Sequence, residues 1–234
     1  MNKILKSELL KLKGSLTLNL ILILSIIQLF TIIQLFTIPL YLQFTNNSVV
    51  IENIIFLPML GYCILASIFS IFLHEQEEKA NFFQNIKSEK NSGIIWGIKL
   101  ISTDLLMVLL GVPVWIVVGV EFNRLSYFAY VGVITWLLLV LLNHFHMLLS
   151  LIMGKGGNLV ISFIECLFII FATNKVFLNN FWLPIVLPVN MILEIGKNEI
   201  FMILVYLIGF IILSYFCNLA VMNNVEIQKI CKKR

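Results

Sequence analysis

The chain has 234 residues, of which 60% are hydrophobic and 12% are charged. Soluble domains are about 45–50% apolar and about 25% charged, so this composition excludes an ordinary soluble enzyme, a secreted disulfide scaffold and a disordered tail. The net charge of +4 matters less in a membrane protein than where the basic residues lie. We predict an integral membrane protein.

Residues 2–13 are basic and can form an amphipathic helix, with Leu5, Leu9 and Leu12 on one face. The apolar run that follows is too long for the core of a signal peptide, so we expect this segment to be retained as an anchor. A basic amphipathic helix lies along the cytoplasmic interface with its lysines near anionic headgroups. The alternative is that these lysines only orient the first span.

Six apolar stretches are long enough to cross the bilayer, which takes roughly 20 residues for about 30 Å of hydrocarbon. They are residues 16–42, 54–73, 98–120, 127–152, 159–178 and 200–222. The links between them are too short to hold a separate soluble domain. The predicted fold is therefore all-α and polytopic, with six transmembrane helices in a single domain over residues 1–234.

The link after the second span, His74–Ser88, is rich in Glu and contains neither Pro nor Gly. We predict a short cytoplasmic helix here. Its exposed phenylalanines indicate a partner that covers them, so we expect it to dock a cytoplasmic subunit. The alternative is that it folds back on the lipid headgroups. The residues expected to contact the partner are Glu77, Glu78, Lys79, Phe82, Phe83 and Ile86.

Several ionisable residues lie within the predicted spans, and two of them are acids. Asp104 is near the start of the third span, and we expect its side chain to reach the cytoplasm. Glu165 is deeper, where a charged acid costs about 2.5–3.5 kcal/mol unless it is neutral or paired. His146 and Glu165 each lie about 14 Å from the turn around Lys155–Gly156, at 1.5 Å per residue, so we predict a contact between them.

His144 completes the predicted intramembrane polar cluster with His146 and Glu165, although residues two apart on a helix point about 200° apart. The alternative is that His146 and Glu165 face different neighbours. If the contact forms, we favour a packing clamp over a proton relay.

The outer link before the last span, residues 179–199, is too apolar for a free loop and is interrupted by Pro184 and Pro188. Non-helical backbone at membrane depth occurs only where protein or a water-filled cavity satisfies it. We therefore predict broken re-entrant helices on the outer leaflet, formed around Phe181, Trp182, Pro184 and Pro188, with Trp182 at the membrane interface. A merely hydrophobic loop is the alternative.

Basic residues set the predicted orientation. Of the 16 Lys and Arg residues, 13 fall before the first span, around the second and fourth links, or after the last span. Only Arg124, Lys175 and Lys197 fall on the other side. The positive-inside rule then predicts that both termini are cytoplasmic, as six spans require.

The sequence contains no complete catalytic motif that we recognise. His74 and Glu75 begin like the zinc-protease pattern H-E-x-x-H, but Glu78 stands where the second His must be. The phosphate-binding pattern G-x-x-x-x-G-K-[ST] is absent from the chain. We predict that the chain is not an enzyme and holds no cofactor or metal, and that any ATP with its Mg²⁺ is bound by another subunit.

These features together resemble the permease subunits of ABC transporters of the ABC-2 exporter class. The resemblance rests on Ser7–Lys13 before the first span, the six spans, the Glu-rich stretch His74–Ser88 and the broken outer segment. The short length and the lack of a large outer domain are most similar to the lantibiotic-immunity permeases, which expel antimicrobial peptides. The chain departs from many relatives in having no Pro near residues 88–92.

The resemblance implies a multi-pass protein of the bacterial plasma membrane. Its partners would be two copies of a cytoplasmic ABC ATPase, a second permease chain of the same or a related kind, membrane lipid and an amphiphilic peptide substrate, with no nucleic acid. The stretch Glu77–Lys87 would couple to the ATPase. The expected function is ATP-driven export of a membrane-active antimicrobial peptide. The alternatives are export of another hydrophobic drug or antibiotic, ATP-independent transport, a membrane-embedded enzyme, or a purely structural role.

Overall fold

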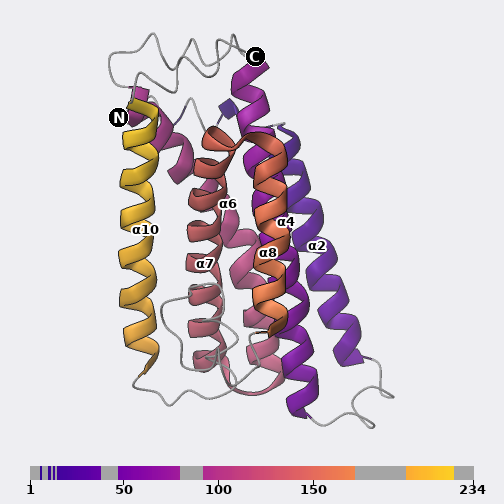
Figure 1. The fold of residues 1–234 in the computed structure, drawn as a ribbon. Helices are drawn as coiled ribbons and strands as arrows, with labels where there is room; N and C mark the ends of the chain where they lie inside the picture. The colour runs from indigo at the N-terminus through magenta and orange to yellow at the C-terminus, as the bar shows by residue number, and fades with distance from the viewer. Residues whose placement is uncertain are drawn as a thin grey trace.

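The computed structural model describes residues 15–37, 47–79, 92–171 and 199–223, together with Lys6, Leu10, Lys11 and Lys13. These residues form six helices and, within the described ranges, no strand (Figure 1). The helices are α2 (Leu16–Thr37), α4 (Asn47–Lys79), α6 (Ser92–Glu121), α7 (Leu125–Ile152), α8 (Gly154–Phe171) and α10 (Glu199–Asn223).

Five of the helices are long and apolar enough to cross a membrane, namely α4, α6, α7, α8 and α10. In α2 the apolar run with described side chains, Leu16–Ile32, is shorter. The predicted all-helical architecture is thus confirmed for the described residues, five of whose helices could cross a membrane, while the count of six spans stays a prediction. The ends of α6, α7 and α10 lie close to the predicted spans, except that α6 begins six residues earlier, at Ser92.

The helices stand side by side in one bundle, with α10 at one edge and α2 at the other (Figure 1). Helix α7 packs against α6, α10, α4 and α8, whereas α2 packs against α6 and α4. Cross-helix contacts bring the start of α2, the end of α4, the start of α6, the α7–α8 turn and the end of α10 together. We call this the basic end, because Lys11, Lys13, Lys79 and Lys155 lie there.

The Glu-rich stretch after the second span begins as a continuation of α4. His74–Lys79 forms the last turns of this helix, so the described part of the predicted cytoplasmic helix is continuous with the second span, and residues 80–88 lie outside the described residues. The reason is local: no Pro or Gly interrupts the chain there, and Glu75 pairs with Lys79 at 3.7 Å, one turn later. Phe82, Phe83 and Ile86 lie outside the described residues.

The turn between α7 and α8 is tighter than predicted. Only Met153 separates the two helices, and Gly154 takes a positive φ of 73° that a residue with a Cβ rarely adopts. The predicted turn around Lys155–Gly156 and the predicted start of the span at residue 159 are therefore wrong. Because the reversal occurs at Gly154, Lys155 and Asn158 lie on the first turns of α8.

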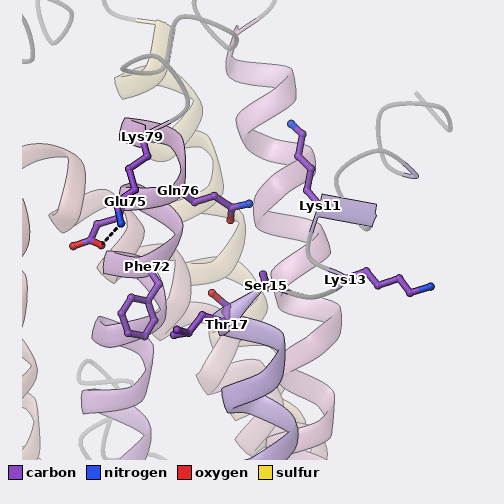
Figure 2. Close-up of a pocket in the computed structure, with 9 residues that line it drawn as sticks. Lys11, Lys13, Ser15, Thr17, Phe72, Glu75, Gln76 and Lys79 are labelled. Atoms are coloured by element: carbon purple, nitrogen blue, oxygen red, sulfur yellow. Dashed lines mark ion pairs between the residues drawn. The ribbon is translucent and has the colours of Figure 1, made fainter.

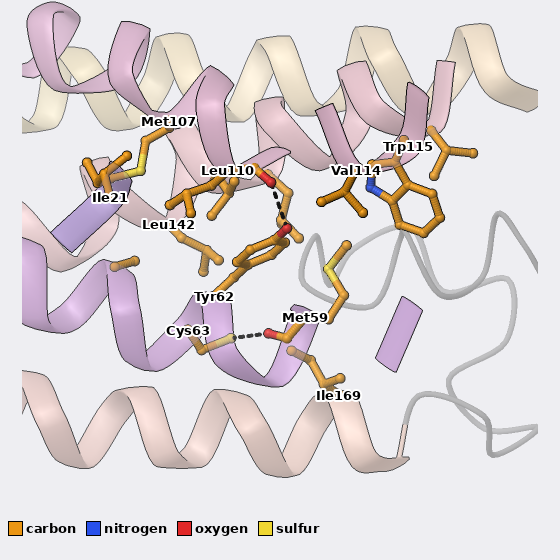
Figure 3. Packing of buried hydrophobic residues seen from close by; sticks show 14 of the residues in the cluster. Ile21, Met59, Tyr62, Cys63, Met107, Leu110, Val114, Trp115, Leu142 and Ile169 are labelled. Atoms are coloured by element: carbon orange, nitrogen blue, oxygen red, sulfur yellow. Dashed lines mark hydrogen bonds between the residues drawn. The ribbon is translucent and has the colours of Figure 1, made fainter. Parts of the chain in front are cut away.

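The main apolar core lies between α2, α4, α6 and α7, with α8 on its edge (Figure 3). Tyr62 of α4 is buried at its centre. Its hydroxyl accepts a hydrogen bond from Gln28 of α2 at 2.7 Å and donates one to the carbonyl of Leu110 in α6 at 3.0 Å. One phenol group therefore links three helices, as polar groups do between helices in the absence of water.

Candidate functional site

The predicted contact between His146 and Glu165 is present. His146 Nε2 lies 2.9 Å from Glu165 Oε2, joining α7 to α8. Both residues are buried. The contact forms because the tight turn at Gly154 makes the two helices antiparallel neighbours, so residues at similar distances from the turn lie at the same depth.

Asn158 determines that Nδ1 of His146 carries a hydrogen. Its Nδ2 donates to Ser70 Oγ at 2.7 Å and approaches the backbone carbonyl of Ser67 at 3.4 Å, so its Oδ1 faces His146 Nδ1, at 2.6 Å. An amide oxygen only accepts, so His146 Nδ1 carries a hydrogen. The remaining proton lies between His146 Nε2 and Glu165. The pair is neutral as a whole whichever of the two holds it, which lowers the cost of placing these groups in the membrane.

His144 belongs to a second pair, on another face of α7. Its Nε2 lies 2.8 Å from Oδ2 of Asp104 in α6, and its Nδ1 lies 3.1 Å from Ser214 Oγ in α10. Ser214 donates its own hydrogen to the carbonyl of Ile211, so it accepts from Nδ1. Asn143 donates to the other oxygen of Asp104 at 2.9 Å. The second pair repeats the chemistry of the first.

Two expectations are thereby corrected. Asp104 is buried and paired rather than extended toward the cytoplasm. The predicted cluster of His144, His146 and Glu165 does not form: His146 pairs with Glu165 and His144 pairs with Asp104, since side chains two residues apart on α7 face different helices. Sequence reasoning missed the residues that complete the pairs, which are Asn143, Asn158 and Ser214. Polar residues inside apolar runs were the available signal, because such side chains form hydrogen bonds between membrane helices.

Glu77, predicted to contact a partner, points into the protein. Its carboxylate forms an ion pair with the ammonium group of Lys99 in α6, and both residues are almost fully buried. Glu77 therefore does not lie on a surface that a partner can contact directly. It instead connects the last turns of α4 to the second turn of α6.

Glu78 and Lys79 lie on the surface of the basic end, as a partner-contacting role requires. Lys155 of α8 pairs with Glu75 at 2.8 Å and with Glu78 at 3.5 Å, while Lys79 pairs with Glu75 at 3.7 Å. These exposed pairs join the end of α4 to the start of α8. Together with the Glu77–Lys99 pair, they attach the end of α4 to two neighbouring helices.

The remaining predicted site residues, Phe82, Phe83, Ile86, Phe181, Trp182, Pro184 and Pro188, lie outside the described residues. In the part of the chain that the structure describes, no three His, Cys, Asp or Glu side chains gather as a metal site would need. Comparisons with known proteins give no family: no protein-family model, no curated protein and no solved structure matches the chain.

Proposed function

We propose that the chain is the permease subunit of an ATP-driven exporter that expels a membrane-active antimicrobial peptide. The proposal rests on one observation, which is that the charged end of α4 is held to its neighbour α6 by an ion pair. This helix continues past its apolar part as far as Lys79, and it is held to α6 by the buried Glu77–Lys99 pair. A subunit that binds this end would move α4 and α6 together.

The proposed mechanism is mechanical, and no residue of this chain performs covalent chemistry in it. ATP is hydrolysed in the partner subunit, which acts on the α4 end through Glu78, Lys79 and the residues that follow. The exposed pairs of Lys155 with Glu75 and Glu78 extend the same motion to α8. Helices that shift as packed units are a common way to convert a local push into a wider rearrangement.

The substrate class rests on the sequence of the predicted outer segment. The sequence of this segment is apolar and aromatic around Phe181 and Trp182 and is interrupted by Pro184 and Pro188, a composition that suits an amphiphilic peptide better than a polar solute. A second permease chain, the same or related, would complete the pathway across the membrane.

A copurification experiment tests the partner. The tagged full-length chain is purified in mild detergent from its host, alongside a variant with Phe82→Asp and Phe83→Asp. We expect a P-loop ATPase to copurify with the wild type and to be lost from the variant. A matched control with Asn123→Asp and Arg124→Asp places two new carboxylates in the α6–α7 turn, away from the basic end, and should keep the ATPase. If no ATPase appears with the wild type in any detergent, the exporter proposal fails.

The substrate is tested in cells that express the chain with its ATPase. We expect raised resistance to lantibiotics, and unchanged resistance to small hydrophobic antibiotics, compared with cells that express the Phe82→Asp, Phe83→Asp variant. Protection against the small antibiotics alone would assign the exporter to another hydrophobic drug.

A second candidate is ATP-independent, proton-coupled transport, and the two buried His–carboxylate pairs favour it. Ionisable groups inside the membrane often mark proton pathways. This candidate requires that Asp104→Asn or Glu165→Gln abolish transport while the protein still folds, and that a protonophore stop transport while ATP remains. The exporter requires ATP, and it tolerates the protonophore.

A further inference from the structure

Helix α2 is attached to the bundle through one face. At the basic end Thr17 points toward Phe72 of α4 (Figure 2). One turn farther along, Ile21 lies beside Met107 of α6 in the main apolar core (Figure 3). The buried residues of this face are Thr17, Ile21, Ser25 and Ile32.

The opposite face of α2 is exposed, because the helix stands at the edge of the bundle (Figure 1). With 3.6 residues per turn, Asn19, Ile23, Ile26 and Phe30 lie within about 60° of one another and directly opposite the buried face. The three apolar residues are 53%, 64% and 61% exposed, and Asn19 is exposed as well. We call these four residues the α2 seam.

Asn19 is the part of the seam that contact with acyl chains does not explain. Its carboxamide has two donor hydrogens and an acceptor oxygen, and no residue that the structure describes forms a hydrogen bond with it. A polar group without a partner is costly in hydrocarbon, so polar side chains of membrane helices form hydrogen bonds to other helices. The position of Asn19 on α2 excludes the helices of its own bundle.

Asn19 also lies within the apolar layer. It is three residues past the start of α2 at Leu16. Ile21 lies beside Met107, which is at the middle of α6 (Ser92–Glu121). At 1.5 Å per residue, Asn19 is only about 3 Å nearer to the basic end than Ile21. Its short side chain therefore lacks the reach with which a lysine extends to the headgroups.

A second copy of this chain matches the seam because identical residues would meet. Two copies inserted in the same direction are related by a twofold axis along the membrane normal, which makes their α2 helices parallel and brings each seam residue close to its own equivalent. A carboxamide is self-complementary, since each one can donate to the oxygen of the other. Paired Asn side chains fix the register of parallel helices in the same way in coiled coils.

We propose that two copies of this chain pack α2 against α2 through the seam, with the two Asn19 carboxamides hydrogen-bonded to each other. Ile23, Ile26 and Phe30 form the apolar remainder of the contact. The inference rests on the proposed function in that it identifies the second permease chain of the exporter as a copy of this one. The contact itself involves no ATPase, so it can be tested in the absence of that subunit.

Cysteine cross-linking in membranes tests the contact. The full-length chain, without its native cysteines, carries a single Ile26→Cys and is oxidised with copper phenanthroline. We expect a disulfide-linked species of twice the mass of the chain, because the seam brings residue 26 of the two copies together. Val160→Cys on α8 is the matched control: Val160 is 59% exposed, similar to Ile26, and should give only the monomer.

The role of Asn19 is measured by the dimerisation constant in lipid vesicles, from energy transfer between labelled copies at decreasing protein-to-lipid ratios. We expect Asn19→Ala to lower the constant about 3- to 30-fold, which corresponds to about 0.6–2 kcal/mol for a hydrogen bond between membrane helices. Asn19→Gln keeps a carboxamide and should retain most of the dimer. Thr31→Ala is the control on the same helix, because the exposed Thr31 hydroxyl already donates to the carbonyl of Ile27, at 2.8 Å.

Three results would overturn the proposal. Ile26→Cys may not exceed Val160→Cys in cross-linking, it may cross-link only to a different membrane protein, or Asn19→Ala may leave the dimerisation constant unchanged. Thermal unfolding checks that each variant is folded. A monomer that still copurifies with an ATPase would overturn the dimer alone, whereas a dimer for which no ATPase is found would overturn the exporter alone.

Discussion

Glu77 and Lys99 are 4% and 3% exposed, so two opposite charges lie inside the protein close to where α4 leaves its apolar part. Removing water from two charges is costly, and their attraction repays that cost only while both are present. The two residues therefore depend on each other more strongly than any surface pair. This dependence can be measured.

We expect Glu77→Ala to lower the free energy of unfolding by about 3–5 kcal/mol, since it removes the carboxylate that forms an ion pair with Lys99 in the interior. The double variant Glu77→Leu, Lys99→Met should recover most of the loss. Denaturant unfolding in detergent, followed by tryptophan fluorescence, measures both. The exposed pair Glu78–Lys155 is the matched control, and Glu78→Ala should cost only about 0–1 kcal/mol. Equal losses at the two sites would mean that the buried pair has no special role.

The His146–Glu165 pair leads to a second prediction at the residue scale. Glu165→Leu removes the carboxylate that lies against His146 Nε2, and we expect a loss of about 1–3 kcal/mol for a buried polar atom that loses its partner. Glu165→Gln should keep most of the stability, because an amide can donate to the lone pair of Nε2. The same unfolding assay compares them. If both variants lose stability equally, the pair requires a charged carboxylate.

At the scale of elements, α6 and α7 approach each other through glycines. A Cβ on Gly111 of α6 would lie 3.0 Å from the backbone N and Cα of Trp136 in α7, and a Cβ on Gly132 of α7 would lie 3.2 Å from Trp115 Cβ. Small residues at such positions let membrane helices pack closely. The close contact in turn brings Asp104 of α6 within reach of His144 of α7.

Gly111→Ala should therefore push α6 away from α7, because backbone atoms cannot rotate aside as a side chain can. We expect a loss of stability of about 1–3 kcal/mol, measured as a lower midpoint of thermal unfolding. Gly61→Ala in α4 is the matched control: nothing lies within 4 Å of its added Cβ, and alanine favours a helix by up to about 1 kcal/mol over glycine. A harmless Gly111→Ala would contradict the close approach.

At the scale of the whole molecule, the contacts agree with a chain that crosses back and forth. The end of α4 meets the α7–α8 turn through Glu75 and Lys155, and the start of α6 meets the end of α10 through Gly93 and Asn223, at 3.0 Å. The second and fourth links and the end of the last span, which the six-span prediction places on one side of the membrane, thus begin or end at one end of the bundle. The orientation of that end toward the cytoplasm stays a prediction from the basic residues.

Cysteine labelling tests the orientation. In a background without the native cysteines, Asn123→Cys lies in the α6–α7 turn and Lys155→Cys lies at the basic end. We expect a membrane-impermeant maleimide to label Asn123→Cys on intact cells and Lys155→Cys only after the membrane is opened. The reverse pattern would invert the topology, and with it the side on which an ATPase can bind.

The membrane class, the helical fold and the approximate places of the spans were predictable from the sequence, because apolar length is a local property and the bilayer demands helices. The contact of His146 with Glu165 was also predictable, since a short turn fixes the depth of both residues. In each of these cases one stretch of chain contains all the necessary information.

Other features depend on which helices become neighbours, and only the tertiary structure decided them. The sequence places Asp104 near the start of the third span, but α7 places His144 and Asn143 against it, and Ser214 of α10 contacts His144 in turn. Glu77 looks like its exposed neighbour Glu78 until α6 places Lys99 against it. A buried charge is stable only beside its partner, and the two residues of each pair come from different helices, so local pattern cannot reveal them.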